Sequence, residues 1–286
     1  MKILNVITLL TFWLCMLKVS AQGTNYSNVN KDTYWKKFTH DLNSIIGGVG
    51  HAYTRPLTWK EDQMALFGGI VVGAFGLYTI DDDAHNWFSK QEPHVPKLVK
   101  DYGWYYGNPQ NNYALNGIVY LTGLIGKNDK IRRTGVLMIS SATATGLLQQ
   151  VSKSLVGRAR PRSGLKKNDF RPFQANSDFH SFPSGHTALA FSNAHALAKQ
   201  FENPWLKGGI YLLGSIPPLT RLWNGAHWLT DIALSIALSV VTVEAIDNYL
   251  DKHYDNVQKE EKMNIKKRLS WQLVVKPRSL GVTFNF

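Results

Sequence analysis

The sequence predicts an all-α protein, a six-helix up-and-down bundle that is followed by a short C-terminal β-hairpin. Six apolar runs with helical spacing lie between residues 64 and 250, and apolar residues alternate along residues 269–286. The chain has 286 residues, of which 44% are hydrophobic. This length and composition suffice for one large domain with its own core, and they exclude an intrinsically disordered protein.

The N-terminus has the pattern of an export signal, and we predict a signal peptide over residues 1–21. Lys2 supplies positive charge, residues 3–17 are apolar, and Val19-Ser20-Ala21 is a small-residue cleavage site. The only cysteine, Cys15, lies inside this segment. The mature protein would therefore have no disulfide, no cysteine nucleophile and no thiolate metal site.

An N-terminal extension, residues 22–62, is predicted to hold a short amphipathic helix. Apolar residues recur at helical spacing from Trp35 to Ile46, and Gly47-Gly48 is expected to end the helix. Such a stripe fits packing on a domain core, and it also fits contact with a membrane surface.

The predicted helical domain, residues 63–250, contains the six apolar runs. The first run ends at Asp81-Asp82-Asp83, which we expect to form a solvated helix end. An aromatic, glycine- and asparagine-rich segment, residues 101–112, is expected to be a loop that could line a substrate mouth. The runs cover residues 64–80, 113–125, 134–152, 184–199, 208–222 and 228–250.

The last segment, residues 251–286, is predicted to be a charged linker and the β-hairpin. Residues 251–268 are rich in charged side chains, and they could also continue the last helix. Alternating apolar residues on both sides of a turn at residues 276–279 predict the two strands.

Three polar clusters lie at the ends of the apolar runs. The first follows the third run and contains Lys153, Arg158 and Arg160. The planar fork of arginine can bind two phosphate oxygens, and lysine adds a point charge. Basic residues are also favourable at any helix C-terminus, so this cluster alone has two interpretations.

The second cluster, Pro183-Ser184-Gly185-His186, has the pattern of a helix start with Ser184 as its N-cap. A helix N-terminus presents free amide groups to an anion. Gly185 would allow a ligand close to the backbone, and His186 would lie in the first turn.

The third cluster contains Arg221, His227 and Asp231. His227 and Asp231 are four residues apart, so on one helix they would share a face. A carboxylate bonded to one imidazole nitrogen would fix the tautomer and leave the other nitrogen free to attack. In an up-and-down bundle all three clusters would meet at one end, which predicts a single phosphate site.

These clusters resemble the three-part signature of the type 2 phosphatidic acid phosphatase superfamily, which includes bacterial acid phosphatases and vanadium haloperoxidases. The matching patterns are Lys153-x6-Arg160-Pro161, Pro183-Ser184-Gly185-His186 and Arg221-x5-His227-x3-Asp231. Thr220 stands where the family usually has serine, and it keeps the hydroxyl. The resemblance implies a helical bundle of the acid phosphatase and haloperoxidase type.

The resemblance also implies a metal-independent phosphatase that acts through a phosphohistidine. His227 would be the nucleophile, Asp231 would orient it, and His186 would protonate the leaving oxygen and later activate water. No cofactor and no metal ion are implied. The residues implied to hold the phosphoryl oxygens are Lys153, Arg160, Ser184, Gly185 and Arg221.

The formal net charge of +12 fits an anionic partner of several kinds. The resemblance implies a phosphorylated lipid or a small phosphoester as substrate, a membrane surface as a further partner, and no nucleic acid. Two alternatives stay open: a vanadium haloperoxidase that binds vanadate in the same site, and an envelope interaction protein with a degenerate site. Every catalytic position is filled, which counts against the second alternative.

The export signal conflicts with six membrane spans, because the third run would then end in the cytoplasm together with Lys153. The mean hydropathy of −0.19 is low for six spans, and basic residues lie at both ends of the bundle. We therefore predict export to the periplasmic side of a bacterial envelope, with the domain soluble or membrane-associated. An integral membrane protein is the alternative.

Overall fold

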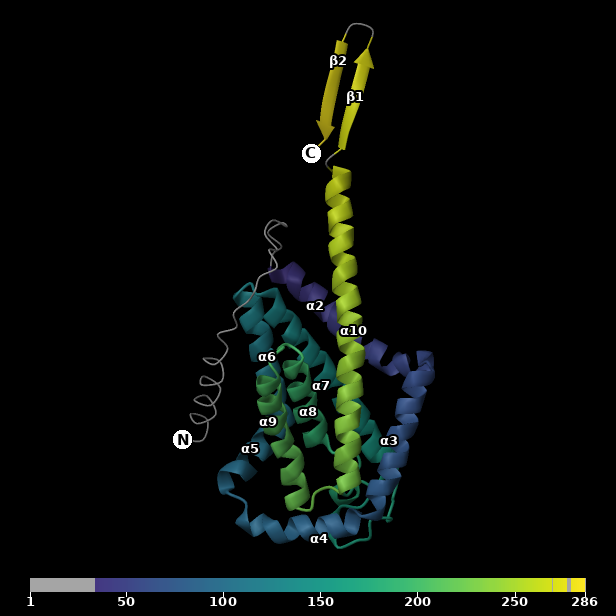
Figure 1. The fold of residues 1–286 in the computed structure, drawn as a ribbon, viewed down its shortest axis with the longest axis vertical. Coiled ribbons are helices and arrows are strands. Elements are labelled where there is room, and N and C mark those ends of the chain that lie inside the picture. Colours follow the sequence, from purple (N-terminus) through teal and green to yellow (C-terminus); the bar gives the residue numbers. More distant parts are fainter. Residues whose placement is uncertain (1–33, 269, 277–278, 286) are drawn as a thin grey trace. The chain divides into compact units, whose positions relative to one another are not determined.

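The computed structural model describes residues 34–268, 270–276 and 279–285, and it describes side chains up to residue 254. The predicted signal peptide and Cys15 lie outside the described residues. Within them the architecture is predominantly helical, as predicted (Figure 1).

All six predicted apolar runs form helices, and the charged segment 251–268 continues the last of them. The charged linker of the prediction is thus helical over residues 251–268. The six helices are α3 (Glu61–Thr79), α6 (Pro109–Ile125), α7 (Asp129–Val156), α8 (Gly185–Ala198), α9 (Pro204–Trp223) and α10 (Leu229–Arg268).

Two strands follow α10 in the sequence, β1 (Ser270–Lys276) and β2 (Ser279–Asn285). They pair antiparallel, with Ser270 opposite Asn285 and Lys276 opposite Ser279. An antiparallel pairing of two consecutive strands is the arrangement expected of a hairpin.

The first described helix, α2 (Tyr34–Thr54), does not end at Gly47-Gly48, so that prediction was wrong. A Cβ atom on Gly47 would lie 2.0 Å from the Tyr249 hydroxyl oxygen, and one on Gly48 would lie 3.2 Å from an Ile246 methyl. The two glycines therefore allow close packing of α2 on α10, and they do not terminate the helix.

Two further helices lie between the first two runs, where we had predicted a solvated helix end and a loop: α4 (Asp81–Gln91) and α5 (Lys97–Gly107). The three acids are the first turn of α4, where negative charge favours the helix dipole. The expected loop over residues 101–112 is instead the end of α5 and the start of α6. The described residues also include four short 3-10 helices: Arg55–Thr58, Glu92–His94, Pro161–Ser163 and Ser177–Phe179.

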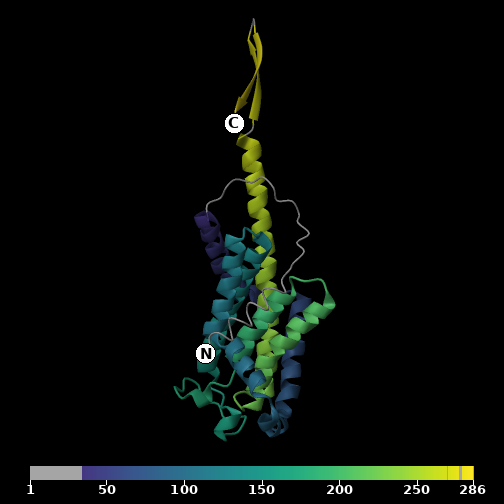
Figure 2. The ribbon, with the colours of Figure 1, turned by 90° about the vertical axis from the view of Figure 1, so that its left-hand side faces the viewer.

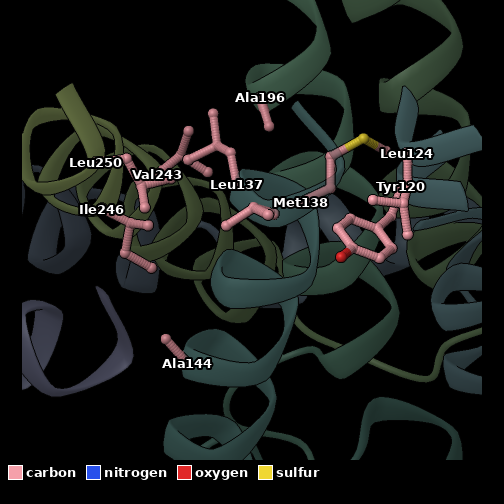
Figure 3. Close-up of a cluster of buried hydrophobic side chains, with 10 residues drawn as sticks. Tyr120, Leu124, Leu137, Met138, Ala144, Ala196, Val243, Ile246 and Leu250 are labelled. Carbon is pink, nitrogen blue, oxygen red and sulfur yellow. The ribbon is translucent and has the colours of Figure 1, made fainter. Parts of the chain in front are cut away.

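The hydrophobic core joins α6, α7, α8 and α10 around the middle helix α7 (Figure 3). Val136 and Leu137 of α7 are fully buried, as are Val243 and Ile246 of α10. The long connection from α7 to α8 lies at the same end of the helices as α4 (Figure 2). That end therefore combines the C-terminus of α7 with the N-termini of α8 and α10.

Among the described residues, only 229–254 form a helical stretch that is long and apolar enough to cross a membrane. Helix α3 together with the α4 segment would count as a second span only if the pair, bent by 64°, crossed as one unit. Half of the apolar window within residues 229–254 is buried inside the protein.

Candidate active site

Helix α7 ends at Gly157, and this end positions the first cluster. Gly157 has a left-handed φ of 59°, and a Cβ atom there would lie 2.0 Å from the Arg171 carbonyl oxygen. Its amide donates to the Lys153 carbonyl in the last helical turn. Lys153 is thus held on the helix, and the chain turns so that Arg158 and Arg160 lie in the following connection.

Helix α8 begins at the second cluster, and Ser184 is its N-cap, as predicted. The Ser184 hydroxyl oxygen accepts from the Thr187 amide at 3.4 Å and from the Thr187 hydroxyl at 2.9 Å. A Cβ atom on Gly185 would lie 2.7 Å from the Gln149 side-chain oxygen and 3.4 Å from Lys153 Nζ. The lysine of α7 and the free amides of α8 therefore adjoin the same space.

Arg221 and His186 share an aromatic neighbour, Trp104 of α5. The Arg221 guanidinium lies 4.7 Å from the Trp104 ring centroid, and the His186 and Trp104 ring centroids are 5.2 Å apart. Trp104 is about half exposed, at 48% of its surface, so it forms a wall between the site and solvent.

Arg160 is aimed at His227 by a set of carbonyl groups. It donates to the carbonyl oxygens of Ser177, His180 and Ala226 at 2.8 to 3.0 Å. One guanidinium nitrogen then lies 3.3 Å from His227 Nε2. Most of the donors of Arg160 are used to fix its position, and the fixed group lies beside the predicted nucleophile.

Three cations gather here without a carboxylate partner in the part of the chain that the structure describes. Lys153 and Arg160 are half-buried and Arg221 is buried, and none of the three makes an ion pair. Burial and the neighbouring Arg160 lower the pKa of Lys153 to about 8. Burial, followed by the charge of nearby arginines, lowers the pKa of Arg160 and of Arg221 to about 10. Such a site favours an anion.

The same cations act on the two histidines. Burial and the charges of Arg221, Lys153 and Arg160 lower the pKa of His186 to about 3. Burial and the charge of Arg160 also lower the pKa of His227 far below its usual value. Both rings are therefore neutral at pH 7 when the site holds no anion.

Three buried polar atoms at the site have no hydrogen-bond partner among the described residues: His186 Nε2, Arg221 Nε and the Gln149 side-chain oxygen. Buried polar atoms are normally paired, so these atoms indicate a site for a polar ligand. An oxyanion could accept from Arg221 Nε, and also from His186 Nε2 when that nitrogen carries the proton. No group of three histidine, cysteine or acidic side chains within the described residues is arranged to hold a metal ion.

The predicted pairing of His227 with Asp231 is wrong in its geometry. His227 precedes α10, so the two residues do not share a helix face. Asp231 instead turns back to accept from the Trp228 amide at 3.0 Å, as an acid at the third helical position commonly does. His227 Nδ1 lies 2.5 Å from the Ser181 carbonyl, and the Ser181 hydroxyl donates to Asp231 at 2.5 Å. Ser181 therefore links the two residues.

Two further residues have contacts that the sequence did not predict. Arg158, which we noted in the first basic cluster without assigning it a role, forms ion pairs with Asp231 at 2.6 Å and with Asp81 at 2.7 Å. Asp81, expected at a solvated helix end, is fully buried. Only a tertiary contact distinguishes Asp81 from the two acids beside it, so no sequence signal was available.

Comparison with known proteins supports the family. Residues 134–253 match the model of the PAP2 superfamily, and this range includes all three motifs. Over this range the chain is similar to the type 2 phosphatidic acid phosphatase superfamily, as the motifs predicted.

Individual relatives carry names related to one activity. A protein of Rhizobium etli named lipid A 1-phosphatase is 32% identical over 108 residues, which are 36% of this chain and 44% of the relative. A lipid A 1-phosphatase of Porphyromonas gingivalis is 27% identical over 124 residues, covering 42% of this chain and 25% of the relative. The match thus spans less than half the length of these relatives. The crystal structure of Aquifex aeolicus LpxE matches with a TM-score of 0.43 and 19% identity, over 57% of this chain and 94% of that one.

Proposed function

We propose that this chain is a phosphatase that hydrolyses a phosphate monoester, or a pyrophosphate, on a lipid through a phosphohistidine intermediate. The observation that carries the proposal is the group of three desolvated cations, Lys153, Arg160 and Arg221. They lie close to two neutral histidines, and they have no carboxylate partner within the part of the chain that the structure describes. A phosphate would supply the missing negative charge. The catalytic fold that we propose is the six-helix arrangement of α3 and α6 to α10.

His227 is prepared to act as the nucleophile. A carbonyl oxygen can only accept a hydrogen bond, so the Ser181 carbonyl requires the proton on Nδ1 of His227. The lone pair then lies on Nε2, which faces Arg160. Nε2 attacks phosphorus, the bond from phosphorus to the leaving oxygen breaks, and His186 gives that oxygen a proton.

Water completes the reaction. Its oxygen attacks phosphorus, the bond to Nε2 breaks, and His186 takes a proton from the water. The low pKa of His186 belongs to the site without an anion. A bound phosphate offsets the positive charges that lower this pKa, so substrate binding raises it and allows His186 to carry the proton.

A lipid substrate is supported by the relatives named lipid A 1-phosphatase and by an exposed apolar helix. In α3, Leu66, Phe67, Val72 and Phe75 are each about half exposed or more. A helix that exposes large apolar side chains along its length fits contact with a membrane. We place the enzyme at the periplasmic side of a bacterial envelope, associated with the membrane surface.

A phosphate-release assay on the purified protein in detergent tests the proposal. The panel contains phosphatidic acid, isoprenyl diphosphate, lipid A and p-nitrophenyl phosphate. Vanadate should inhibit release, and EDTA should not. His227→Ala should abolish turnover while the circular dichroism spectrum and melting temperature are retained. Full activity in a folded His227→Ala variant would exclude the mechanism.

A further inference from the structure

A buried ion-pair network connects to Nδ1 of His227, the ring nitrogen that does not face Arg160. Its centre is Arg158, which is only 3% exposed. One guanidinium nitrogen donates to Asp231 at 2.6 Å, another donates to Asp81 at 2.7 Å, and Nε donates to the Lys167 carbonyl. The flat guanidinium also packs near the rings of Tyr78 and Trp228.

Asp81 connects this network to the start of α10. One of its oxygens accepts from the Thr230 amide at 2.9 Å, and the other accepts from the Thr230 hydroxyl at 2.8 Å and from Arg158. The amides in the first turn of α10 have no acceptor within the helix. The Asp81 carboxylate, at the start of α4, accepts from one of them. The same carboxylate therefore fixes Arg158 and the helix that carries Asp231.

A continuous chain of hydrogen bonds runs from Asp81 to the attacking ring. Arg158 joins Asp81 to Asp231, the Ser181 hydroxyl donates to Asp231, and the Ser181 carbonyl faces His227 Nδ1. All of these side chains are buried. A shift of Asp81 would therefore move the acceptor that sets the tautomer and direction of His227.

We propose that Asp81 and Arg158 are positioning residues for the phosphoryl-transfer step, acting on His227 through Asp231 and Ser181. This inference rests on the proposed phosphatase function. It adds Asp81, which precedes the matched family region, and Arg158, which lies at an unspecified position of the first motif and whose guanidinium donors bond to Asp231, Asp81 and the Lys167 carbonyl.

The charges of the network suit this role. The network brings the carboxyl group of Asp231 close to His227 through Ser181, and the His227 ring becomes positive when Nε2 is phosphorylated. Burial raises the pKa of Asp231, and the charge of Arg158 opposes that rise. A buried ion-pair triad contributes little stability compared with apolar packing, so a role in positioning gives a physical reason for it.

The test compares Asp81→Asn with Thr230→Val in the full chain, with p-nitrophenyl phosphate as substrate. Asp81→Asn keeps the size of the side chain and removes its charge. We expect kcat to fall by about 10- to 100-fold, as for small displacements of a reacting group, with KM within about threefold. Inhibition by inorganic phosphate should be unchanged, because Lys153, Arg160 and Arg221 stay in place.

Thr230→Val is the matched control. It removes one hydrogen bond of Asp81 and keeps the Thr230 backbone amide and the pair with Arg158, so kcat should stay within about threefold of the wild type. A folded Asp81→Asn enzyme with wild-type kcat would overturn the inference. Equal losses in both variants, or a loss confined to KM, would also overturn it.

Arg158→Lys provides a second route if Asp81→Asn does not fold. It keeps the positive charge and loses the fork that bridges two carboxylates, and we expect a similar loss of kcat. Wild-type kcat in this variant would overturn the inference. His227→Ala is measured in parallel: if it is active, the phosphatase mechanism itself fails, whereas an inactive His227→Ala beside a fully active Asp81→Asn rejects only the positioning role.

Discussion

The two ends of α7 carry cations of different kinds. Near its N-terminus, Arg132 pairs with Asp41 at 3.0 Å and Arg133 pairs with Asp247 at 2.9 Å. Near its C-terminus, Lys153 has no carboxylate partner among the described residues. Both ends look equally basic in the sequence. Among the described residues, the cations withdrawn from solvent are paired at the first end and unpaired at the second, whereas Lys130 at the first end is exposed and donates to the Gln200 carbonyl.

The paired cations at the first end stabilise the fold, whereas the unpaired cations at the second end are available to a ligand. Burial alone would raise the pKa of Asp41, but a hydrogen bond with His40 and the charge of Arg132 bring it below its usual value. The Arg132 end is therefore internally neutralised and stabilises the packing of α2 on α6, α7 and α10. At the Lys153 end the pKa values of the cations are lowered, which means that the folded protein tolerates unneutralised charge there. A ligand of opposite charge would offset that cost.

The largest effect is expected at the paired end. Arg132→Ala leaves Asp41 buried without its cation and should lower the free energy of unfolding by about 3–5 kcal/mol. Activity per folded molecule should be unchanged. Urea unfolding measures the loss, with Lys97→Ala in the exposed pair with Asp101 as a control that should have little effect. An Arg132→Ala protein with the wild-type free energy of unfolding would show that the paired cation does not stabilise the fold.

The second-largest effect is expected at the C-terminal end of α7, where the cations make no ion pair. Arg221→Ala should reduce kcat/KM by about 10²- to 10³-fold, as the loss of one donor to a developing charge commonly does. Its melting temperature should not fall, because the removed cation has no carboxylate partner. Steady-state kinetics and thermal unfolding of the same sample check both parts. A variant that loses stability but keeps kcat/KM would show that Arg221 is structural.

A smaller effect is expected in the pH dependence of kcat/KM, and it should increase gradually as the pH rises. Lys153 has a pKa of about 8 in the free enzyme, so it loses its charge as pH rises through this value. We expect kcat/KM to fall above pH 8, by up to about tenfold per pH unit, because kcat/KM reports the free enzyme. Lys153→Arg keeps the charge and should lack this alkaline decrease. Identical profiles for both proteins would assign the decrease to another group.

The smallest effect is expected at the wall of the site. Trp104→Leu removes the ring beside Arg221 and should weaken binding of inorganic phosphate by about 2- to 5-fold, corresponding to about 0.5–1 kcal/mol for a partly exposed cation–π contact. Trp104→Phe keeps an aromatic face and should lose less. Competitive inhibition by phosphate measures both, and an equal loss in the two variants would exclude the contribution of the ring.

The helices and the convergence of the motifs could be predicted because their signals are local. The N-cap at Ser184 and the apolar periodicity of the six runs depend on residues a few positions apart. The failures concern long-range contacts. Gly47-Gly48 has the pattern of a helix end, and only the neighbouring Tyr249 and Ile246 show that it is a packing surface.

The sequence by itself determined the resemblance to the family, the helical fold and the residues of the three motifs, since these depend on spacing along the chain. Only the tertiary structure decided which buried charges neutralise one another. Arg158 and Arg160 are two residues apart, but one pairs with Asp81 and Asp231 and the other faces His227 without a carboxylate. The physical reason is that ion pairing depends on proximity in space, and Asp81 lies 77 positions from Arg158 in the chain.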